Sequence, residues 1–157
     1  MMELDSFPED LKRRALEVGQ VLRMEMFPND SVRPKKGKTS KEKRFVIIGR
    51  DGDMLVAALL INSSINKNLF MQIGPYQHLI TSDRYEFLDH DSYVDGYLIR
   101  EFSAERVLKS AEYLGSLLQE DVNESIQRAI ESPKIKPYLI KKYKLRTHLK
   151  KFRTRKA

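Results

Sequence analysis

The stretch Phe45-Val-Ile-Ile-Gly-Arg-Asp-Gly-Asp-Met-Leu-Val-Ala-Ala-Leu-Leu-Ile61 decides the fold of this chain. It holds two apolar runs, 45–48 and 54–61, and each has the length of a strand that is buried on both faces. The Asp-Gly pair between the runs is a strong signal for a tight hairpin turn. The sequence therefore predicts an antiparallel hairpin at 45–61 as the core of a sheet.

Segments on both sides of this hairpin add further strands and helices. A capping box at Ser6–Glu9 predicts an N-terminal helix, and Gly19 ends it. Ser103 is a favourable N-cap for a second helix, and Gly115 stands where its C-terminal cap is expected. Short strands bracketed by helices indicate an α+β chain, mainly β, built on a small and strongly bent antiparallel sheet or barrel. We expect strands at 20–27, 69–73, 85–88 and 92–99, and helices at 6–18, 104–114 and 117–130.

The composition indicates a soluble globular protein. The 157 residues suffice for one domain, and 41% hydrophobic with 32% charged residues are typical of a folded chain. No run approaches the roughly 18 apolar residues of a membrane span, and the N-terminus is acidic where a signal peptide is basic. The chain has no cysteine, which excludes disulfides, a thiolate nucleophile and thiolate metal ligands. We therefore expect a cytoplasmic protein with no membrane partner.

Positive charge is concentrated in two places. Seven of the twelve residues from Arg33 to Arg44 are Lys or Arg. Residues 134–157 hold eleven Lys or Arg and no acidic residue, whereas residues 1–133 hold 18 basic and 22 acidic groups. The net charge of +7 is therefore a property of the C-terminal tail. A cationic loop and tail of this kind either bind a polyanion such as RNA or are simply solvated.

The tail also has the aromatic residues of a nucleic-acid binder. Tyr138, Tyr143, His148 and Phe152 are interleaved with its charges and can stack on bases. We expect RNA to contact the loop, the end of the second core strand and the tail through Arg33, Lys35, Lys36, Lys38, Lys41, Lys43, Ser64, Lys141, Lys142 and Arg146.

Four segments, in order, resemble the PemK/MazF-type toxins. Residues 19–28, Gly-Gln-Val-Leu-Arg-Met-Glu-Met-Phe-Pro, are similar to the opening strand of that family. Residues 37–48 resemble its charged loop and the Arg-Pro-apolar strand, with Phe45 in place of the proline. Residues 60–64, Leu-Ile-Asn-Ser-Ser, resemble the strand that ends in Thr or Ser. Residues 91–106 resemble the late Ser-x-Val-Asp strand, the Ile-Arg pair and the following helix.

The resemblance implies an SH3-like antiparallel β-barrel at 19–115. An N-terminal helix at 1–18, an accessory helix at 116–133 and a basic tail at 134–157 would flank it. The resemblance also implies a homodimeric endoribonuclease, the toxin of a type II toxin-antitoxin system, which cleaves single-stranded RNA and is inhibited by an acidic antitoxin. The residues alone leave two other functions open, a non-catalytic RNA- or DNA-binding module and a protein-interaction domain whose basic tail binds an acidic partner.

Metal-independent RNA cleavage uses the ribose 2′-OH as the nucleophile and leaves a 2′,3′-cyclic phosphate and a 5′-OH end. The site must accept the 2′-OH proton, stabilise charge on the phosphorane and protonate the leaving oxygen. Such a site needs no cofactor. His78 and His90 lack partners at metal-ligand spacing, so the sequence predicts no metal site.

Four residues are the candidates for this chemistry. By the resemblance, Arg44 matches the catalytic arginine, and Ser63, with Ser64 as the fallback, matches the hydroxyl residue that binds the scissile phosphate. Asp95 matches an acidic position that serves some members as the general base. His90 is a separate candidate, because imidazole is a natural proton shuttle near neutral pH.

Each candidate also has a structural interpretation. Arg44 can pair with an acidic neighbour such as Glu42 at a strand end. Ser63 fits a turn that ends a strand, and Asp95, followed by glycine, fits a hairpin turn. His90 lies between two aspartates and can be an exposed hydrogen-bonded residue.

Overall fold

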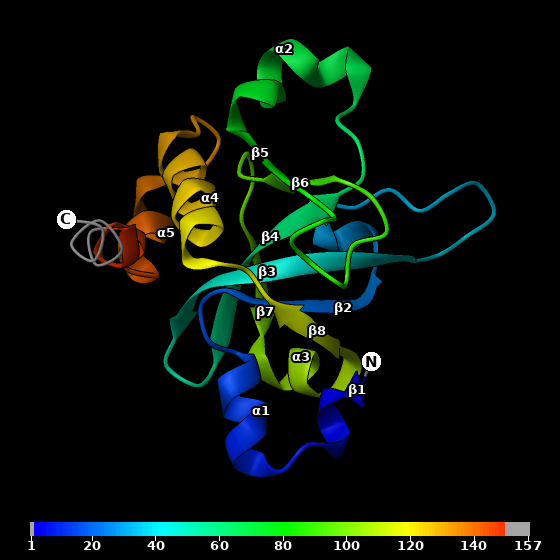
Figure 1. Cartoon of the computed structure of the whole chain (residues 1–157), viewed down its shortest axis with the longest axis vertical. Coiled ribbons are helices and arrows are strands. Elements are labelled where there is room, and N and C mark those ends of the chain that lie inside the picture. The colour runs from blue at the N-terminus through cyan, green and yellow to red at the C-terminus, as the bar shows by residue number, and fades with distance from the viewer. Residues whose placement is uncertain (1, 150–157) are drawn as a thin grey trace.

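The computed structural model describes residues 2–149, and the predicted hairpin lies at its centre (Figure 1). β3 (Lys41–Asp51) and β4 (Leu55–Asn62) pair in antiparallel register, with Val46 opposite Leu59. The Asp-Gly turn joins them, and Gly52 has the positive φ of 59° that tight hairpin turns require. β3 is longer than the predicted 45–48, because residues 41–44 and 49–51 continue the strand at its two ends.

One antiparallel sheet of eight strands is built around this hairpin. The strand order is β1-β8-β2-β3-β4-β6-β5, and β7 pairs with β4 off this path. The other strands are β1 (Met2–Glu3), β2 (Gln20–Met26), β5 (Gln77–Ile80), β6 (Ser92–Asp95), β7 (Arg100–Ser103) and β8 (Glu112–Ser116).

The sheet is bent but does not close. β4 pairs with β7 through residues 55–58 and with β6 through Ile61 and Asn62, so the sheet divides at this strand. The two end strands, β1 and β5, are two and four residues long and do not pair with each other in the described part of the chain. The prediction of an α+β, mainly β chain is confirmed. The prediction of a closed barrel is wrong, because closure needs strands that pair around the full circle.

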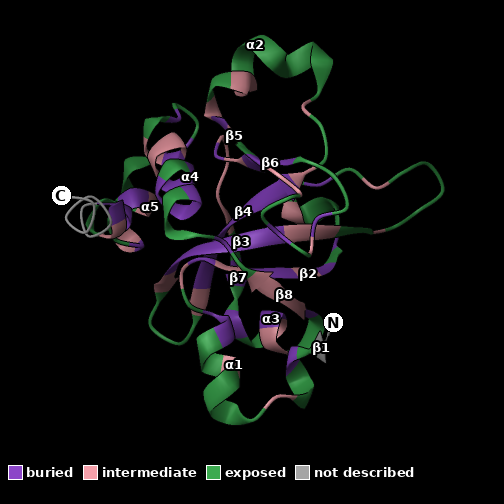
Figure 2. Cartoon of the chain, viewed as in Figure 1, coloured by how far each residue is buried: buried purple, intermediate pink, exposed green. Residues whose placement is uncertain are grey.

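Helices and turns cover both faces of the sheet, so the centre of β3 and β4 is buried on both sides (Figure 2). Side chains alternate along β3. Val46 belongs to the apolar cluster on the side of α4 (Gln119–Glu131), whereas Phe45 belongs to the cluster with α3 (Ala104–Ser110) and α1 (Glu9–Ala15). None of the helices within residues 2–149 is long and apolar enough to cross a membrane.

Two of the predicted strands are wrong. Residues 67–73 form a 3-10 turn followed by α2 (Phe70–Ile73), and this segment stands away from the sheet (Figure 1). Residues 85–88 form a turn in which the backbone N–H of Leu88 donates to the carbonyl of Tyr85 over 3.2 Å. Tyr85 and Leu88 are both buried, so their apolar character reflects a turn packed on the core. β5, which lies between these two segments in the sequence and pairs with β6, was not predicted.

The helix predicted at 104–114 is shorter than expected, and a strand follows it. Ser103 caps its N-terminus as predicted, since its Oγ accepts the N–H of Arg106 over 3.1 Å. The helix ends at Ser110, and the chain continues as β8, which pairs with β2. Gly115 therefore lies inside a strand and is not a helix cap, because pairing with β2 satisfies the backbone here. The next predicted helix, 117–130, is confirmed as α4.

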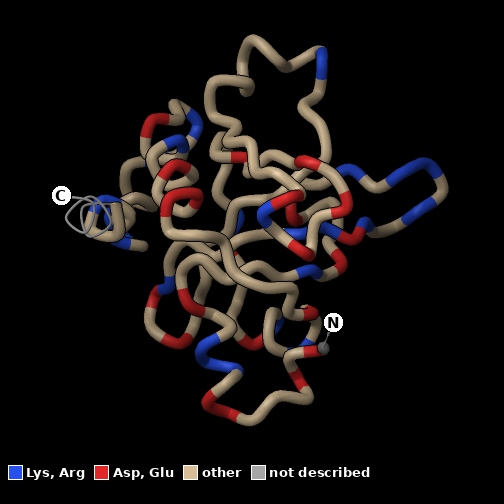
Figure 3. The backbone as a smooth tube through the Cα atoms, in the orientation of Figure 1, with Lys and Arg blue, Asp and Glu red and all other residues tan. Residues whose placement is uncertain are grey.

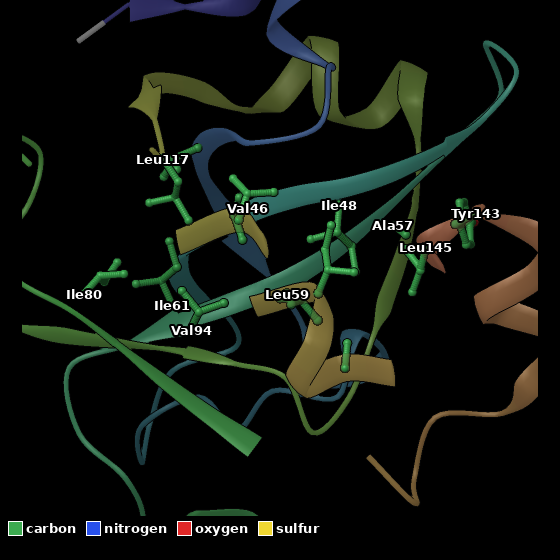
Figure 4. Packing of buried hydrophobic residues seen from close by; sticks show 14 of the residues in the cluster. Val46, Ile48, Ala57, Leu59, Ile61, Ile80, Val94, Leu117, Tyr143 and Leu145 are labelled. Atoms are coloured by element: carbon green, nitrogen blue, oxygen red, sulfur yellow. The ribbon is translucent and has the colours of Figure 1, made fainter. Parts of the chain in front are cut away.

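The first part of the expected basic tail is packed onto the protein. α5 (Pro137–Lys142) and the helical residues 145–149 follow α4, and Ile140, Tyr143 and Leu145 belong to the same apolar cluster as β3 and β4. Figure 4 shows Tyr143 and Leu145 next to Ala57 of β4. Tyr143 is fully buried, so its predicted stacking on RNA bases is wrong. Residues 150–157, with the predicted contact of Phe152, lie outside the described residues.

Candidate functional site

The start of β3 separates two polar clefts, one on each face of the sheet. Alternation along the strand puts Arg44 on the face of α4 and Lys43 on the face of α3. The Arg44 cleft, of about 290 Å³, is lined by Arg23, Lys41, Glu42, Lys43, Arg44, Ile61, Ser63 and His90. The Lys43 cleft, of about 190 Å³, is lined by Ser31, Val32, Arg33, Lys41, Lys43, Leu60, Asn62, Asp95 and Arg100.

The cationic loop 33–40 extends from this region, away from the body of the protein (Figure 3). Arg33 and Lys41 line the Lys43 cleft, and Lys41 also lines the Arg44 cleft. Lys35, Lys36 and Lys38 are exposed along the loop. The positive charge that the loop was predicted to bring to RNA therefore lies beside both clefts.

Three segments bring Arg44, Ser63 and His90 together in the Arg44 cleft. Arg44 pairs across β3 and β4 with Ile61, and Ser63 lies two positions beyond Ile61, on the same side of the chain. His90 comes from the connection between β5 and β6. Buried Leu88 anchors that connection in the core, and the carbonyl of His90 accepts the Oγ of Ser92 over 3.1 Å.

The two arginines of this cleft differ in their pairing. Nη2 of Arg23 lies 3.0 Å from Glu112 Oε2, and its Nε lies 3.1 Å from Glu42 Oε1. Arg44, with 26% of its side chain exposed, has only a long 3.9 Å contact with Asp89 among the described ion pairs. The carboxylate of Asp89 is 86% exposed and therefore screened by water. Arg44 is thus the guanidinium that a phosphate can engage.

Three of the four predicted catalytic residues lie in one cleft, and the fourth does not. Arg44, Ser63 and His90 line the Arg44 cleft, whereas Asp95 lines the Lys43 cleft on the opposite face. The reason is the register of β6, because Val94 lies opposite Ile61 and shares its face, so Asp95 points the other way. Ser64 is exposed and is not part of either lining.

Asp95 has hydrogen-bond partners of its own. Its Oδ1 accepts Nε2 of Gln77 over 2.8 Å and the backbone N–H of Tyr97 over 2.9 Å. Its Oδ2 lies 3.9 Å from Nη1 of Arg100. These contacts suit a carboxylate that organises the Lys43 cleft rather than one that acts on a phosphate held by Arg44.

The Lys43 cleft holds two cations that are largely withdrawn from water. Burial, together with the nearby charges of Lys41 and Arg100, lowers the pKa of Lys43 to about 8. The Nζ of Lys43 donates to Oδ1 of Asn62. Burial also lowers the pKa of Arg100, although Asp95 opposes this shift. Sequence reasoning did not select Asn62 or Arg100, since only the pairing of β3, β4 and β7 brings them to Lys43.

The remaining predicted contacts lie elsewhere on the molecule. Lys142 forms a 3.0 Å ion pair with Glu101. Lys141 and Arg146 line a separate cavity of about 380 Å³ beside α5. The predicted tail site is therefore a surface of the folded body, distinct from both clefts.

The other histidine in the middle of the chain has a structural role. Nε2 of His78 lies 2.8 Å from Oδ1 of Asp121, a buried residue that also accepts the hydroxyl of Tyr85. This cluster joins β5 to the first turn of α4. Across residues 2–149 no group of three or more His, Asp or Glu side chains is arranged to hold a metal ion.

Comparisons with known proteins do not assign the chain to a family. No protein-family model matches the sequence. The curated proteins likewise include no significant match. The functional argument therefore depends on the two clefts and on the residues that line them.

Proposed function

We propose that the chain is a PemK/MazF-type endoribonuclease that cleaves single-stranded RNA in the Arg44 cleft. The observation that carries the proposal is the meeting of Arg44, Ser63 and His90, three residue types suited to phosphodiester cleavage, in one cleft. These three residues are far apart in the sequence and meet only in the fold. Arg44 has no close ionic partner among the described residues, so its guanidinium is available to a phosphate. The exposed cations of loop 33–40 add sequence-independent affinity for the RNA backbone.

Each of the three residues has one role in the reaction. The 2′-oxygen attacks the adjacent phosphorus, and the bond from phosphorus to the 5′-oxygen breaks. His90 accepts the proton of the 2′-OH, and water protonates the leaving 5′-oxygen. The guanidinium of Arg44 stabilises the extra negative charge on the phosphorane oxygens, while the hydroxyl of Ser63 donates to one of them. The products are a 2′,3′-cyclic phosphate and a 5′-OH end.

The proposal includes an SH3-like relationship of fold. The division of β4 between β6 and β7 supports it, because a strand that serves two partners turns the corner of a strongly bent sheet. The helix α3 directly after β7 agrees with the late Ile-Arg segment and helix of the PemK/MazF pattern.

The proposal also includes two protein partners. A homodimer would sediment with twice the chain mass of 18.4 kDa. An acidic antitoxin segment would bind the cations of loop 33–40 and compete with RNA. A protein that is monomeric at all concentrations would refute the homodimer. An acidic peptide that leaves RNA binding unchanged would refute the competition by an antitoxin.

Cleavage of a long single-stranded RNA in EDTA, with chemical mapping of the new ends, tests the activity. Arg44→Ala should slow cleavage by about 10²- to 10³-fold, the usual effect of removing one charge-stabilising donor. His90→Gln should slow it by about 10²-fold or more. The matched control is Arg13→Ala, which removes an exposed arginine of α1 far from the cleft lining.

The outcomes separate the enzyme from the other functions. Cyclic-phosphate ends that appear with wild type and Arg13→Ala, but not with Arg44→Ala, support the nuclease. If RNA stays intact but is bound by all variants, the protein is a non-catalytic binding module. If the affinity for RNA disappears at physiological salt, the protein is a protein-interaction domain.

A further inference from the structure

Arg100, which lines the Lys43 cleft, has a buried donor that no group in the described chain accepts. Its side chain is 11% exposed, and its Nη1 has no hydrogen-bond partner. The rest of the guanidinium is held by backbone oxygens, since Nη2 donates to the carbonyl of Ser31 over 2.7 Å and Nε lies 3.4 Å from that of Asp30. Buried donors without an acceptor are rare in folded proteins and call for an explanation.

The charge in this cleft is also unbalanced. Arg33, Lys41, Lys43 and Arg100 bring four positive charges to the lining, and Asp95 brings the one negative charge. Asp95 is 3.9 Å from Nη1, too far for a hydrogen bond, and its other oxygen already accepts two donors. Collecting like charges in a half-buried cleft is unfavourable unless an anion completes it.

We propose that the Lys43 cleft is an oxyanion-binding site that takes one phosphate group, separately from the Arg44 cleft. Nη1 of Arg100 and Nζ of Lys43 donate to the phosphate oxygens, and Lys41 and Arg33 close the site from the rim. A guanidinium and an ammonium are the two groups that bind phosphate most often. The volume of about 190 Å³ exceeds the roughly 30 Å³ share of one water several times over, so it holds a phosphate with some water.

The protonation of Lys43 agrees with this assignment. Its pKa near 8 reflects burial and the facing cations Lys41 and Arg100, against the weaker opposite effect of Asp95. Arg33 of the loop lines the same cleft. A bound phosphate would favour the ammonium form, so binding at pH 8 takes up protons.

The phosphate can come from two sources, free phosphate or the backbone of a nucleic-acid strand. Lys41 and Lys43 line both clefts, so the two sites adjoin at the start of β3. A strand that crosses this point could place one phosphodiester in each cleft. The oxyanion site itself does not depend on cleavage in the Arg44 cleft.

Calorimetric titration of the full chain with inorganic phosphate, at constant ionic strength in chloride, tests the site. Lys43→Gln should weaken phosphate binding about tenfold or more, since one charge-assisted hydrogen bond is lost. Arg100→Lys, which keeps the charge but removes Nη1, should also weaken it. Lys36→Gln, which removes an exposed charge of loop 33–40, should change it less than twofold.

Two results would overturn the site: no phosphate binding by wild type, or equal losses for Lys43→Gln and Lys36→Gln. Repeating the wild-type titration at pH 8 in buffers of different ionisation enthalpy should show proton uptake, and its absence would remove Lys43 from the site. If Arg100→Lys fails to fold, Lys43→Gln still decides the matter.

An RNA with 2′-O-methyl groups, which cannot be cleaved by its own 2′-oxygen, distinguishes the two sources. If the site takes a backbone phosphate, saturating inorganic phosphate competes with this RNA, and Lys43→Gln weakens its binding more than Lys36→Gln does. If the site takes free phosphate, RNA and phosphate bind independently. A protein that binds phosphate but never cleaves RNA would refute the nuclease and leave the oxyanion site standing.

Discussion

Asp121 provides the sharpest test of how α4 is fastened to the sheet and to the connection that carries His90. Its side chain is 7% exposed, and Oδ1 lies 2.8 Å from Nε2 of His78 on β5. Oδ2 accepts the hydroxyl of Tyr85, which itself accepts the backbone N–H of Leu118 over 3.0 Å. One carboxylate thus joins β5, the 85–88 turn and the start of α4.

The cost of removing this carboxylate can be worked out from its partners. In Asp121→Ala the hydroxyl of Tyr85 loses its acceptor in a buried site, which costs about 1–3 kcal/mol. The partly exposed His78 loses one hydrogen bond, which adds about 0.5–1.5 kcal/mol. The exposed Arg84, whose Nη1 lies 3.7 Å from Oδ2, adds little. We expect the free energy of unfolding to fall by about 2–4 kcal/mol, a large share of the typical 5–15 kcal/mol of a domain. Asp121→Asn keeps the shape and one acceptor oxygen and should lose about half as much.

Urea unfolding followed by circular dichroism measures this loss, with Glu120→Ala as the matched control. Glu120 precedes Asp121 in the same first turn of α4, so both variants lose a similar interaction with the helix dipole. The side chain of Glu120 is 53% exposed and pairs with Arg84, which is 39% exposed. That exposed pair should be worth less than about 1 kcal/mol. If Asp121→Ala costs no more than Glu120→Ala, the buried cluster does not fasten α4 and the reasoning fails.

Three further substitutions test other parts of the structure by the same unfolding measurement. Lys43→Met should stabilise the protein by about 1–2 kcal/mol at pH 7, because the native state buries a charge there. The folded pKa of Lys43 is about 8 and its ordinary value 10.5, so the unfolded chain binds more protons between these values and wild-type stability rises with pH. The advantage of Lys43→Met should therefore shrink by pH 10, and an advantage that is equal at both pH values would contradict the buried ammonium. Gly49→Ala should cost about 1–3 kcal/mol, since its Cβ would lie 2.7 Å from Cβ of Tyr143; no loss would mean that the C-terminal segment does not pack on β3. Arg106→Gln breaks a bidentate pair in which both distances to Asp30 are 2.7 Å, and should cost about 1–2 kcal/mol at pH 7. Arg106 lowers the pKa of the Asp30 carboxyl below its ordinary 3.8, so this stabilisation is present above that pH and is lost as pH falls through the folded value. A difference between wild type and Arg106→Gln that stays the same from pH 7 to pH 2 would show that the pair does not form.

The part of the candidate site that depends on the residue pattern of a single strand, β3, was predictable from the sequence. The position of Arg44 at the mouth of a buried strand followed from the apolar run after it, and the alternation of β3 separates Arg44 from Lys43. Asp95 was assigned to the same site as Arg44 because both match the PemK/MazF pattern. Its true face depends on which residue of β6 lies opposite Ile61, and that register joins segments more than thirty residues apart. No local pattern encodes such a register, since a shift of one residue reverses every side chain.

The errors in secondary structure have a similar origin. The helix predicted at 104–114 ends at Ser110, although the residues that follow also favour a helix. Residues 112–116 instead pair with the free edge of β2, and this hydrogen bonding outweighs their local helix preference. The charges of residues 134–157 predicted a basic tail that either binds a polyanion or is solvated. Ile140, Tyr143 and Leu145 nevertheless find an apolar surface on β3 and β4, and their burial decides the path of the segment.

The sequence by itself determined the central hairpin, the cap of α3 at Ser103 and the helix α4, because these follow from a period of two, an Asp-Gly turn, a capping hydroxyl and a period of 3.6 residues. Only the tertiary structure decided that Arg44 meets Ser63 and His90, that Asp95 joins Lys43 and Arg100, and that the C-terminal segment is packed. Local patterns act through neighbouring residues, whereas these contacts depend on pairing and burial between distant segments, which are decided by the free energy of the whole fold.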